Sequence, residues 1–459
     1  PWLSYLSFEK YPLTTTEIFE IGKIWPELNH FVDRLIKKYP PLEAGSYLIN
    51  FPESKLRLIL VFGDARETIQ QINGKFDTWF LDGFAPSKNP ELWELDLFKN
   101  MARLSLPQCK VATFSSAGWV RKNLEEAGFQ TQKIQGYGNK KEMTVATFHP
   151  PSITHKKEPH PWFKTPTQQN HSPSSCTIIG AGLAGCFLAH SLSLRGVHVR
   201  LIEQENQIAN KASGNPVAAF MPRLTRGQEA LSQFSLLSFA YLISLKHKLM
   251  LHQTGVLKPF EDPEQDQALA ALFPSLMATL TSEQSSSVAG VKINSNSLYY
   301  PQAGWARPRE ICEKLTESEL IEKNLSVKVN HITRSENIWT LFDQSNRIID
   351  QTETLVIASA YESMLFLQTS WIAQSQVRGQ IVLAPPTRSS STLKTVLSSS
   401  MGISPVIDGH HTIAASYDRQ NLSLEWSAQE ANELLDKAKQ FSEDFGTLEH
   451  KNAGRVALR

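Results

Sequence analysis

The residues best suited to chemistry form a glycine-rich turn near the middle of the chain. The apolar run 176–179 leads directly into GAGLAG, and a helical pattern follows up to Gly196. In such a turn Gly180 makes the tight bend, Gly182 lets the backbone approach a diphosphate and Gly185 lets the helix pack closely on a sheet. The helix start adds amide donors and the positive end of its dipole. The predicted diphosphate-binding residues are Gly180, Ala181, Gly182, Leu183, Ala184 and Gly185.

An acidic residue lies at the distance that a dinucleotide site requires. Glu203 ends the strand-like run VHVRLIE, 23 residues after Gly180, where a carboxylate accepts hydrogen bonds from ribose hydroxyls. A carboxylate without a neighbouring basic group argues against NADP. A glycine-rich turn in an ordinary α/β domain is the competing interpretation, but the strand, helix and acid together favour a dinucleotide site.

A small polar loop, KASGN at 211–215, follows Glu203. It resembles the loop that contacts the second phosphate and the flavin in the glycine oxidase and D-amino-acid oxidase superfamily, and so favours FAD. Ser213, Gly214 and Asn215 would donate to phosphate or ribityl oxygens. On these residues alone, an ordinary polar turn fits equally well.

Three arginines further along could contact a substrate, and Arg307 or Arg309 could hold its carboxylate. Arg307 and Arg309 lie in YPQAGWARPREIC, which fits a helix returning from a substrate domain, and Arg378 lies in VRGQ before the strand-like IVLA. The run 402–418 is typical of a hairpin in an antiparallel substrate sheet. For a single arginine, a solvated or structural role is the commoner one.

A second set of candidates follows strand-like runs in the first 150 residues. Asp82 ends such a run in LDGFAP, where open parallel sheets bind ligands. Its carboxylate could accept hydrogen bonds from an amine and help to remove a proton as a methyl group is added, while Phe84 offers a stacking face for a base. The alternative is that Asp82 caps the next turn with Phe84 in the core. Glu9 and Asp64 also end strand-like runs, as the acids that hold S-adenosylmethionine do in Rossmann-like methyltransferases.

The elements that must position these residues fall into three segments. Residues 1–150 alternate strand-like and helical patterns, which predicts a mostly parallel sheet covered on both faces. Residues 151–174 are rich in Pro, Ser, Thr and His, which predicts a linker, or less favourably a strap anchored by Trp162 and Phe163. We expect an α/β protein: a Rossmann-like methyltransferase domain, the linker, and at 175–459 an FAD-binding Rossmann domain of the glycine oxidase type with an antiparallel substrate subdomain.

The composition is that of a globular protein, with 41% hydrophobic and 20% charged residues. A formal charge of +1 gives no global basic field, so any RNA contact must come from local patches. The four cysteines lack zinc-site spacing, and we therefore expect free thiols and no metal site. The lack of a membrane-length apolar run and of a signal-peptide pattern predicts a cytoplasmic protein.

Together these segments resemble the MnmC family of bifunctional bacterial tRNA-modifying enzymes. The matching stretches are LSFEKYPL, FDTWFLDGFAPSKNPELW, MARLS, VATFSSAGWVRKNLEEAGF, GYGNKKEM, IIGAGLAG, and ASGN followed by FMPRL. LDGFAPSKNPELW joined to a glycine-oxidase-like domain is specific to this family, whereas neither half alone would be.

The resemblance implies two cofactors, FAD and S-adenosylmethionine, and the wobble uridine of tRNA as substrate, in a monomer. The FAD domain would remove the carboxymethyl group from 5-carboxymethylaminomethyluridine, and the other domain would methylate the remaining amine. The basic residues that could contact tRNA are Arg121, Lys122, Lys140, Lys141, Arg223 and Arg226.

The resemblance also predicts that the chain is shortened. The first strand and glycine loop of the methyltransferase fold would precede Pro1, and GRVALR ends within a strand-like pattern. Both sites would then be incomplete in this chain. Two other functions stay open: a glycine or amine oxidase acting on small molecules, and a tRNA-binding remnant that holds neither cofactor.

Overall fold

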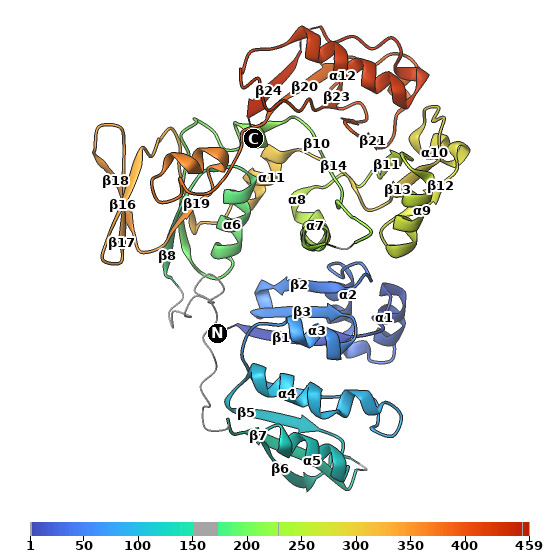
Figure 1. Ribbon diagram of the computed structural model, residues 1–459, viewed down its shortest axis with the longest axis vertical. Coiled ribbons are helices and arrows are strands. Elements are labelled where there is room, and N and C mark those ends of the chain that lie inside the picture. The colour runs from blue at the N-terminus through green and yellow to red at the C-terminus, as the bar shows by residue number, and fades with distance from the viewer. Residues whose placement is uncertain (1, 139, 151–172, 228, 452, 459) are drawn as a thin grey trace. The chain divides into compact units, whose positions relative to one another are not determined.

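The computed structural model describes every residue except 1, 139, 151–172, 228, 452 and 459. The chain divides into two compact units, residues 1–27 with 42–169 and residues 28–41 with 170–459 (Figure 1). The predicted linker 151–174, with Trp162 and Phe163, lies outside the described residues except for its last two positions. The division at 1–150, 151–174 and 175–459 stays a prediction.

The first sheet of the first unit brings two acidic strand ends to one edge. Strand β1 (Leu3–Glu9) pairs in parallel with β3 (Leu56–Phe62), which pairs antiparallel with β2 (Gly45–Phe51). Helix α1 (Thr15–Gly22) begins at the Thr14 cap, whose side chain accepts from the backbone N–H of Glu17. Helix α3 (Ala65–Gln71) follows β3 directly.

The second sheet of this unit has the order β4-β5-β7-β6. Its strands are β4 (Phe76–Leu81), β5 (Ser105–Thr113), β6 (Phe129–Gln135) and β7 (Glu142–Phe148). Helices α4 (Leu95–Leu104) and α5 (Gly118–Glu126) pack with them around Trp93, which is buried. Trp93 links this core to the loop that follows β4.

The prediction of a mostly parallel sheet in this unit is wrong. Only β1 with β3 and β4 with β5 pair in parallel among the described strands of the unit, while the pairs β2–β3, β5–β7 and β6–β7 are antiparallel. The reason is chain length: residues 52–55 and 136–141 are too short for a crossover, so they close hairpins. The parallel pairs hold the acidic strand ends.

The second unit contains a four-stranded parallel sheet that carries the glycine turn. Its order is β15-β9-β8-β19, made of β8 (Ser175–Ile179), β9 (His198–Ile202), β15 (Ile321–Asn324) and β19 (Leu355–Ile357). Helix α6 (Leu183–Ser193) connects β8 with β9, and α11 (Pro308–Leu315) packs against α6. This is the predicted Rossmann arrangement, and it places the turn at the carboxyl end of β8.

An eight-stranded sheet forms the second layer of this unit, with only β11 and β21 paired in parallel. Its strands, in spatial order, are β12 (Ala278–Leu280), β13 (Ser297–Tyr300), β11 (Val256–Pro259), β21 (Val396–Ser398), β22 (Gly402–Ile403), β23 (His411–Ala414), β20 (Arg378–Ala384) and β24 (Gly454–Leu458). Helix α12 (Ala428–Phe441) packs against β20 and β23. The predicted antiparallel substrate sheet is therefore confirmed.

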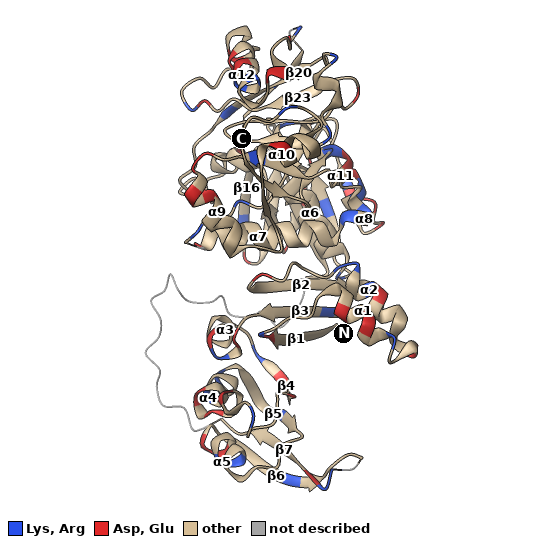
Figure 2. Ribbon diagram, turned by 90° about the vertical axis from the view of Figure 1, so that its right-hand side faces the viewer, with Lys and Arg blue, Asp and Glu red and all other residues tan. Residues whose placement is uncertain are grey.

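The remaining helices and strands named here complete the second unit. They are α2 (Asn29–Ile36), α7 (Ala230–Ser244), α8 (Lys246–Leu249), α9 (Pro263–Leu272), α10 (Ser282–Ala289), β10 (Ala218–Phe220), β14 (Gly304–Ala306), β16 (His331–Ser335), β17 (Ile338–Phe342) and β18 (Ile348–Thr352). Basic and acidic residues occur along the elements of both units (Figure 2). Across the described part of the chain, no helix has the length and apolar character needed to span a bilayer.

Candidate functional sites

The turn after β8 has no room for side chains at its glycines. A Cβ on Gly185 would lie 1.9 Å from the carbonyl oxygen of Gly180, and a Cβ on Gly180, whose φ is +105°, would lie 2.6 Å from the carbonyl oxygen of Ala358. A Cβ on Gly182 would lie 3.0 Å from Ser213 Oγ. The backbone of the turn is thus bare at the start of α6, as close approach of a diphosphate requires.

Glu203 faces this turn from the end of β9. Its Oε2 accepts from the backbone N–H of Ala181 at 2.9 Å, and its Oε1 accepts from the N–H of Glu205 at 3.0 Å. The parallel pairing of β8 and β9 brings Ile179 opposite Ile202, so the two strand ends meet at one edge. A carboxylate fixed by backbone amides in this way retains free lone pairs for ribose hydroxyls.

The loop after Glu203 also reaches the turn. Ser213 and Gly214 belong to a short 3₁₀ turn that Asn215 ends, and Ser213 Oγ accepts from the N–H of Leu183 at 3.1 Å. Leu183 opens α6, with Ala184 next to it inside the helix. The structure therefore brings together the predicted turn, Glu203 and Ser213, which lie in three separate stretches of sequence.

Two acidic residues meet in the first unit because β1 and β3 run parallel. Glu9 is opposite Phe62, and the N–H of Gly63 donates to the Glu9 carbonyl at 2.9 Å. The exposed Glu9 carboxylate accepts only from Ser7 among the described residues, at 2.8 Å. One carboxylate at this edge is therefore open to a ligand.

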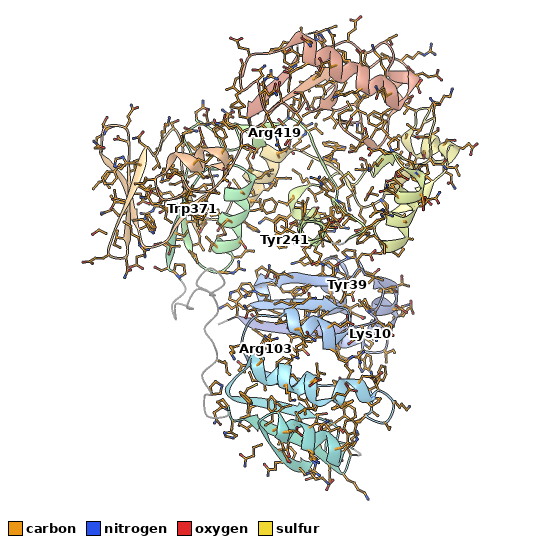
Figure 3. The ribbon with its side chains drawn as sticks, in the orientation of Figure 1. Lys10, Tyr39, Arg103, Tyr241, Trp371 and Arg419 are labelled. Atoms are coloured by element: carbon orange, nitrogen blue, oxygen red, sulfur yellow. The ribbon has the colours of Figure 1, made fainter. Side chains whose placement is uncertain are left out.

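Both carboxylate oxygens of Asp64, by contrast, accept hydrogen bonds. Its Oδ1 accepts from Arg66 N and Nε, both at 3.0 Å, and its Oδ2 accepts from Arg66 Nη2 at 2.8 Å and from Lys10 Nζ at 3.1 Å. Lys10 extends from the end of β1 (Figure 3). Hydrogen bonds from Arg66 hold the pKa of Asp64 far below its usual range. A role in holding S-adenosylmethionine stays a prediction, and it would require Arg66 to release the carboxylate.

Asp82 and Phe84 follow the end of β4. Both are exposed, with 73% of Phe84 accessible, so Phe84 is not a core residue. The Phe84 carbonyl accepts from Trp93 Nε1 at 3.0 Å, which ties the loop to the buried core. Across the described residues, no hydrogen bond to the Asp82 side chain is present that would make it a turn cap. This placement favours the ligand-facing interpretation of LDGFAP.

A cavity of about 630 Å³ lies beside this loop, between the ends of β4 and β5. It is lined by Ala85, Pro86, Phe114, Ser115, Ser116, Ala117, Lys140, Lys141 and Glu142. Lys140 Nζ lies 4.1 Å from the centroid of the Phe114 ring, and Phe114 packs edge-on against Trp93 at 6.0 Å. The cavity therefore combines an aromatic wall, two serine hydroxyl groups, two lysines and the carboxylate of Glu142, and the aromatic and basic groups are suited to a nucleotide.

Known protein families match both parts of the chain. A family of S-adenosyl-L-methionine-dependent methyltransferases matches residues 26–149, and the FAD dependent oxidoreductases match residues 175–459. The tRNA 5-methylaminomethyl-2-thiouridine biosynthesis bifunctional protein MnmC of Pseudomonas savastanoi pv. phaseolicola (strain 1448A / Race 6) is 34% identical over 96% of this chain and 68% of its own length. The chain belongs to the MnmC family. The MnmC of Methylobacillus flagellatus is 32% identical over 100% of this chain and 70% of its own length.

Solved structures share the fold of the second MnmC domain. Glycine oxidase from Geobacillus kaustophilus aligns with a TM-score of 0.52 and 18% identity, over 62% of this chain and 82% of its own. Iminodiacetate oxidase from Chelativorans sp. BNC1 aligns with a TM-score of 0.53 and 14% identity, over 62% of this chain and 83% of its own. The predicted glycine-oxidase-like fold is thereby confirmed.

The residues of the MnmC oxidoreductase domain fit FAD. Gly180, Gly182 and Gly185 form a cradle that any Cβ would fill, and Glu203 and Ser213 border it. When bound, FAD supplies the hydride acceptor. The methyltransferase domain offers Glu9 and Asp82 as exposed carboxylates at strand ends, which fits the ribose and amines of S-adenosylmethionine and its methyl acceptor.

The three predicted substrate arginines have different surroundings in this MnmC chain. Arg307 pairs with Asp408 through two hydrogen bonds of 2.7 and 2.8 Å. Arg309 donates to the side chain of Gln207 at 3.0 Å, beside the polar loop.

Arg378 is fully buried and donates to the Ser423 and Glu425 carbonyls and to Glu430. These contacts join β20 to α12 and give Arg378 a structural role, so we propose no substrate contact for it. For Arg307 and Arg309 a substrate role stays a prediction.

Sequence reasoning missed Arg455, which reaches the polar loop from β24. Its guanidinium donates to the carbonyls of Gly214 at 3.0 Å and Lys211 at 2.6 Å. More than 240 residues separate these partners, so no local pattern could have shown the contact. Phe114 and Ser115 were missed as cavity residues, although they lie in VATFSSAGWV, one of the family-like stretches.

Proposed function

We propose that this chain carries out both MnmC steps on the wobble uridine of tRNA. The oxidoreductase domain converts the 5-carboxymethylaminomethyl group, with or without a 2-thio group on the ring, to 5-aminomethyl. The methyltransferase domain then adds one methyl to give 5-methylaminomethyl. The observation that carries this proposal is the presence in one chain of the bare glycine cradle with Glu203 and of the Asp82 loop beside a nucleotide-sized cavity.

In the first step, the side-chain secondary amine loses a hydride from its carboxymethyl carbon and a proton from nitrogen. Water then adds to the resulting imine, which releases glyoxylate and leaves the primary amine. The glycine cradle would hold the diphosphate of FAD, because Gly180, Gly182 and Gly185 leave the backbone of the turn bare, and FAD would supply the hydride acceptor. Glu203 and Ser213 hold the turn itself in place by accepting from the backbone N–H groups of Ala181 and Leu183.

In the second step, the primary amine must lose a proton as it takes the methyl group. Asp82 is an exposed carboxylate in the loop whose Ala85 and Pro86 line the cavity, and it can accept that proton or a hydrogen bond from the amine. Phe84 and Phe114 can stack on the uracil ring, and Lys140 with Lys141 can contact the adjoining phosphates. We infer that the protein acts as a monomer in the bacterial cytoplasm, where its tRNA substrate is made.

The test is a direct comparison of substrates. We expect the full-length protein with FAD to release glyoxylate from tRNA that carries 5-carboxymethylaminomethyluridine, and then to transfer radiolabelled methyl to the product. Faster turnover of free glycine than of tRNA would instead support a small-molecule amine oxidase. A purified protein without flavin absorbance and without methyl transfer would support a non-catalytic tRNA-binding remnant.

A further inference from the structure

Arg455 connects the substrate sheet to the polar loop of the flavin domain. It lies on β24, opposite Ile381 of β20. Its guanidinium donates to three main-chain carbonyls, those of Asn210, Lys211 and Gly214. A Cβ on Gly214 would lie 2.7 Å from Arg455 Nη1 and 2.5 Å from the Ala209 carbonyl oxygen. The loop is therefore held closely against the guanidinium.

The same loop also contacts the glycine turn. Ser213, next to Gly214, accepts from the N–H of Leu183 at the start of α6. Two hydrogen bonds thus connect Arg455 with the amide end of the helix: Arg455 donates to the Gly214 carbonyl, and the neighbouring Ser213 accepts from Leu183. The positive end of the helix dipole and the guanidinium act on the same region.

A second guanidinium lies beside the same loop. Arg309, from the first turn of α11, donates to Gln207 Oε1 at 3.0 Å and to Asn210 Oδ1 at 3.4 Å. Burial and then the charge of Arg309 lower the pKa of Arg455. Both guanidinium groups donate to Asn210, Arg309 to its side chain and Arg455 to its carbonyl, so the two like charges lie close together.

Neither cation has a carboxylate partner among the described residues. Their acceptors are neutral carbonyl and amide oxygens. The Nε atoms of both Arg309 and Arg455 are buried without a hydrogen-bond partner. Partly buried charges of like sign with unused donors are costly unless an anion offsets them. The pair is thus a site prepared for an anionic ligand.

We propose that Arg309 and Arg455 form a paired cationic site for the diphosphate of FAD, with Arg455 also positioning the loop that carries Ser213. The inference rests on the proposed function, since it presumes that the oxidoreductase domain binds FAD. The diphosphate is favoured over a substrate carboxylate because the loop contacts the amide end of α6 through Ser213, where phosphate binds in this kind of turn.

The test measures FAD affinity of the full-length protein by flavin fluorescence, for the wild type and for Arg455→Met, Arg455→Lys and Arg309→Met. Loss of a charge-assisted hydrogen bond should raise the Kd for FAD roughly 10- to 100-fold in Arg455→Met. Arg455→Lys should fall between this variant and the wild type. Competition by ADP, which has the diphosphate but no flavin ring, should weaken by a similar factor. Salt should weaken FAD binding less in Arg455→Met than in the wild type, because one screened charge is gone.

Arg334→Met is the matched control, because Arg334 lies on β16 and packs over Trp339. It should leave the Kd for FAD unchanged. The inference would be overturned if Arg455→Met bound FAD as tightly as the wild type and also bound ADP as tightly as the wild type. It would also be overturned if the substitution changed only the KM for the carboxymethylated tRNA. If Arg455→Met does not fold, Arg309→Met and Arg455→Lys give the same readout. A wild-type protein that takes up no FAD would overturn both the inference and the proposed function, whereas unaltered variants of an FAD-binding wild type would overturn the inference alone.

Discussion

The glycine turn of the oxidoreductase domain and the acidic strand ends of the methyltransferase domain are built differently. In the turn, backbone atoms define the site: Gly185 has a carbonyl oxygen 1.9 Å from where its Cβ would be, and Glu203 bonds the backbone of Ala181. In the methyltransferase domain, side chains define it: Asp82 is exposed, and Asp64 is saturated by Arg66 and Lys10.

This difference determines how each site should respond to mutation. In a site made of backbone atoms an added side-chain atom would clash, so a substitution there should abolish cofactor binding completely. A site made of separate side chains at strand ends should lose one function at a time, with the fold intact.

The largest effect should come from Gly185→Val. Its branched side chain would collide with the Gly180 carbonyl oxygen, so we expect the purified protein to have no flavin absorbance. The matched control is Gly118→Ala in α5, where a Cβ would meet nothing within 4 Å. Flavin retained by Gly185→Val would show that the turn is not the binding site.

Asp82→Asn should have the next largest effect, confined to one activity. Removing a general base lowers rates roughly 10²- to 10⁴-fold, and we expect such a fall in methyl transfer to aminomethyl-tRNA. Glyoxylate release should be unchanged. Asp77→Asn, at an exposed position on the same strand β4, is the control. A parallel fall in both activities would argue against two separate sites.

A smaller effect should appear in the pH dependence of the free energy of unfolding, through His190 on α6. Burial and the charge of Lys248, whose Nζ lies 3.3 Å from the ring nitrogens, lower the pKa of His190 to about 4. The folded protein keeps His190 neutral while the unfolded chain binds a proton below about pH 6.5. Stability should therefore fall as pH decreases from about 6.5 to about 4 and then level off.

His190→Gln should remove this part of the pH dependence, so that Tm falls a few degrees less than in the wild type over the same range. Thermal unfolding followed by circular dichroism measures it. His198→Gln, at an exposed position on β9, should behave like the wild type. An unchanged pH profile in His190→Gln would assign the acid sensitivity to other groups.

The smallest effect should come from Arg307→Gln. The Arg307–Asp408 pair lowers the pKa of Asp408, but exposed ion pairs contribute only about 0–1 kcal/mol. Because Asp408 engages the Arg307 guanidinium, we expect little change in stability and an unchanged KM for tRNA in glyoxylate release, a result that would reject the substrate role predicted for Arg307 from the sequence. A KM raised tenfold or more would instead show that Arg307 leaves Asp408 to hold the substrate carboxylate.

The sequence allowed prediction of the features that depend on local spacing. The strand, glycine turn, helix and Glu203 follow one another within 30 residues, and their backbone requirements are strict enough to be seen in a single chain. The strand-end positions of Glu9, Asp64 and Asp82 are local in the same sense.

Features that depend on distant partners could not be predicted. The hairpin β2–β3 makes the sheet mixed, although helices and strands alternate around it. Arg378 pairs with Glu430 across 52 positions and is buried, whereas its motif alone indicated a substrate contact. The pairing of Arg455 with the loop at Gly214 depends on the strand order of an eight-stranded sheet.

The most direct test of two separate sites is mass spectrometry of wobble nucleosides from cells whose own copy is replaced by Asp82→Asn or Gly185→Val. We expect 5-aminomethyluridine to accumulate in the first strain and 5-carboxymethylaminomethyluridine in the second. The same intermediate in both strains, or fully modified uridine in either, would contradict this expectation.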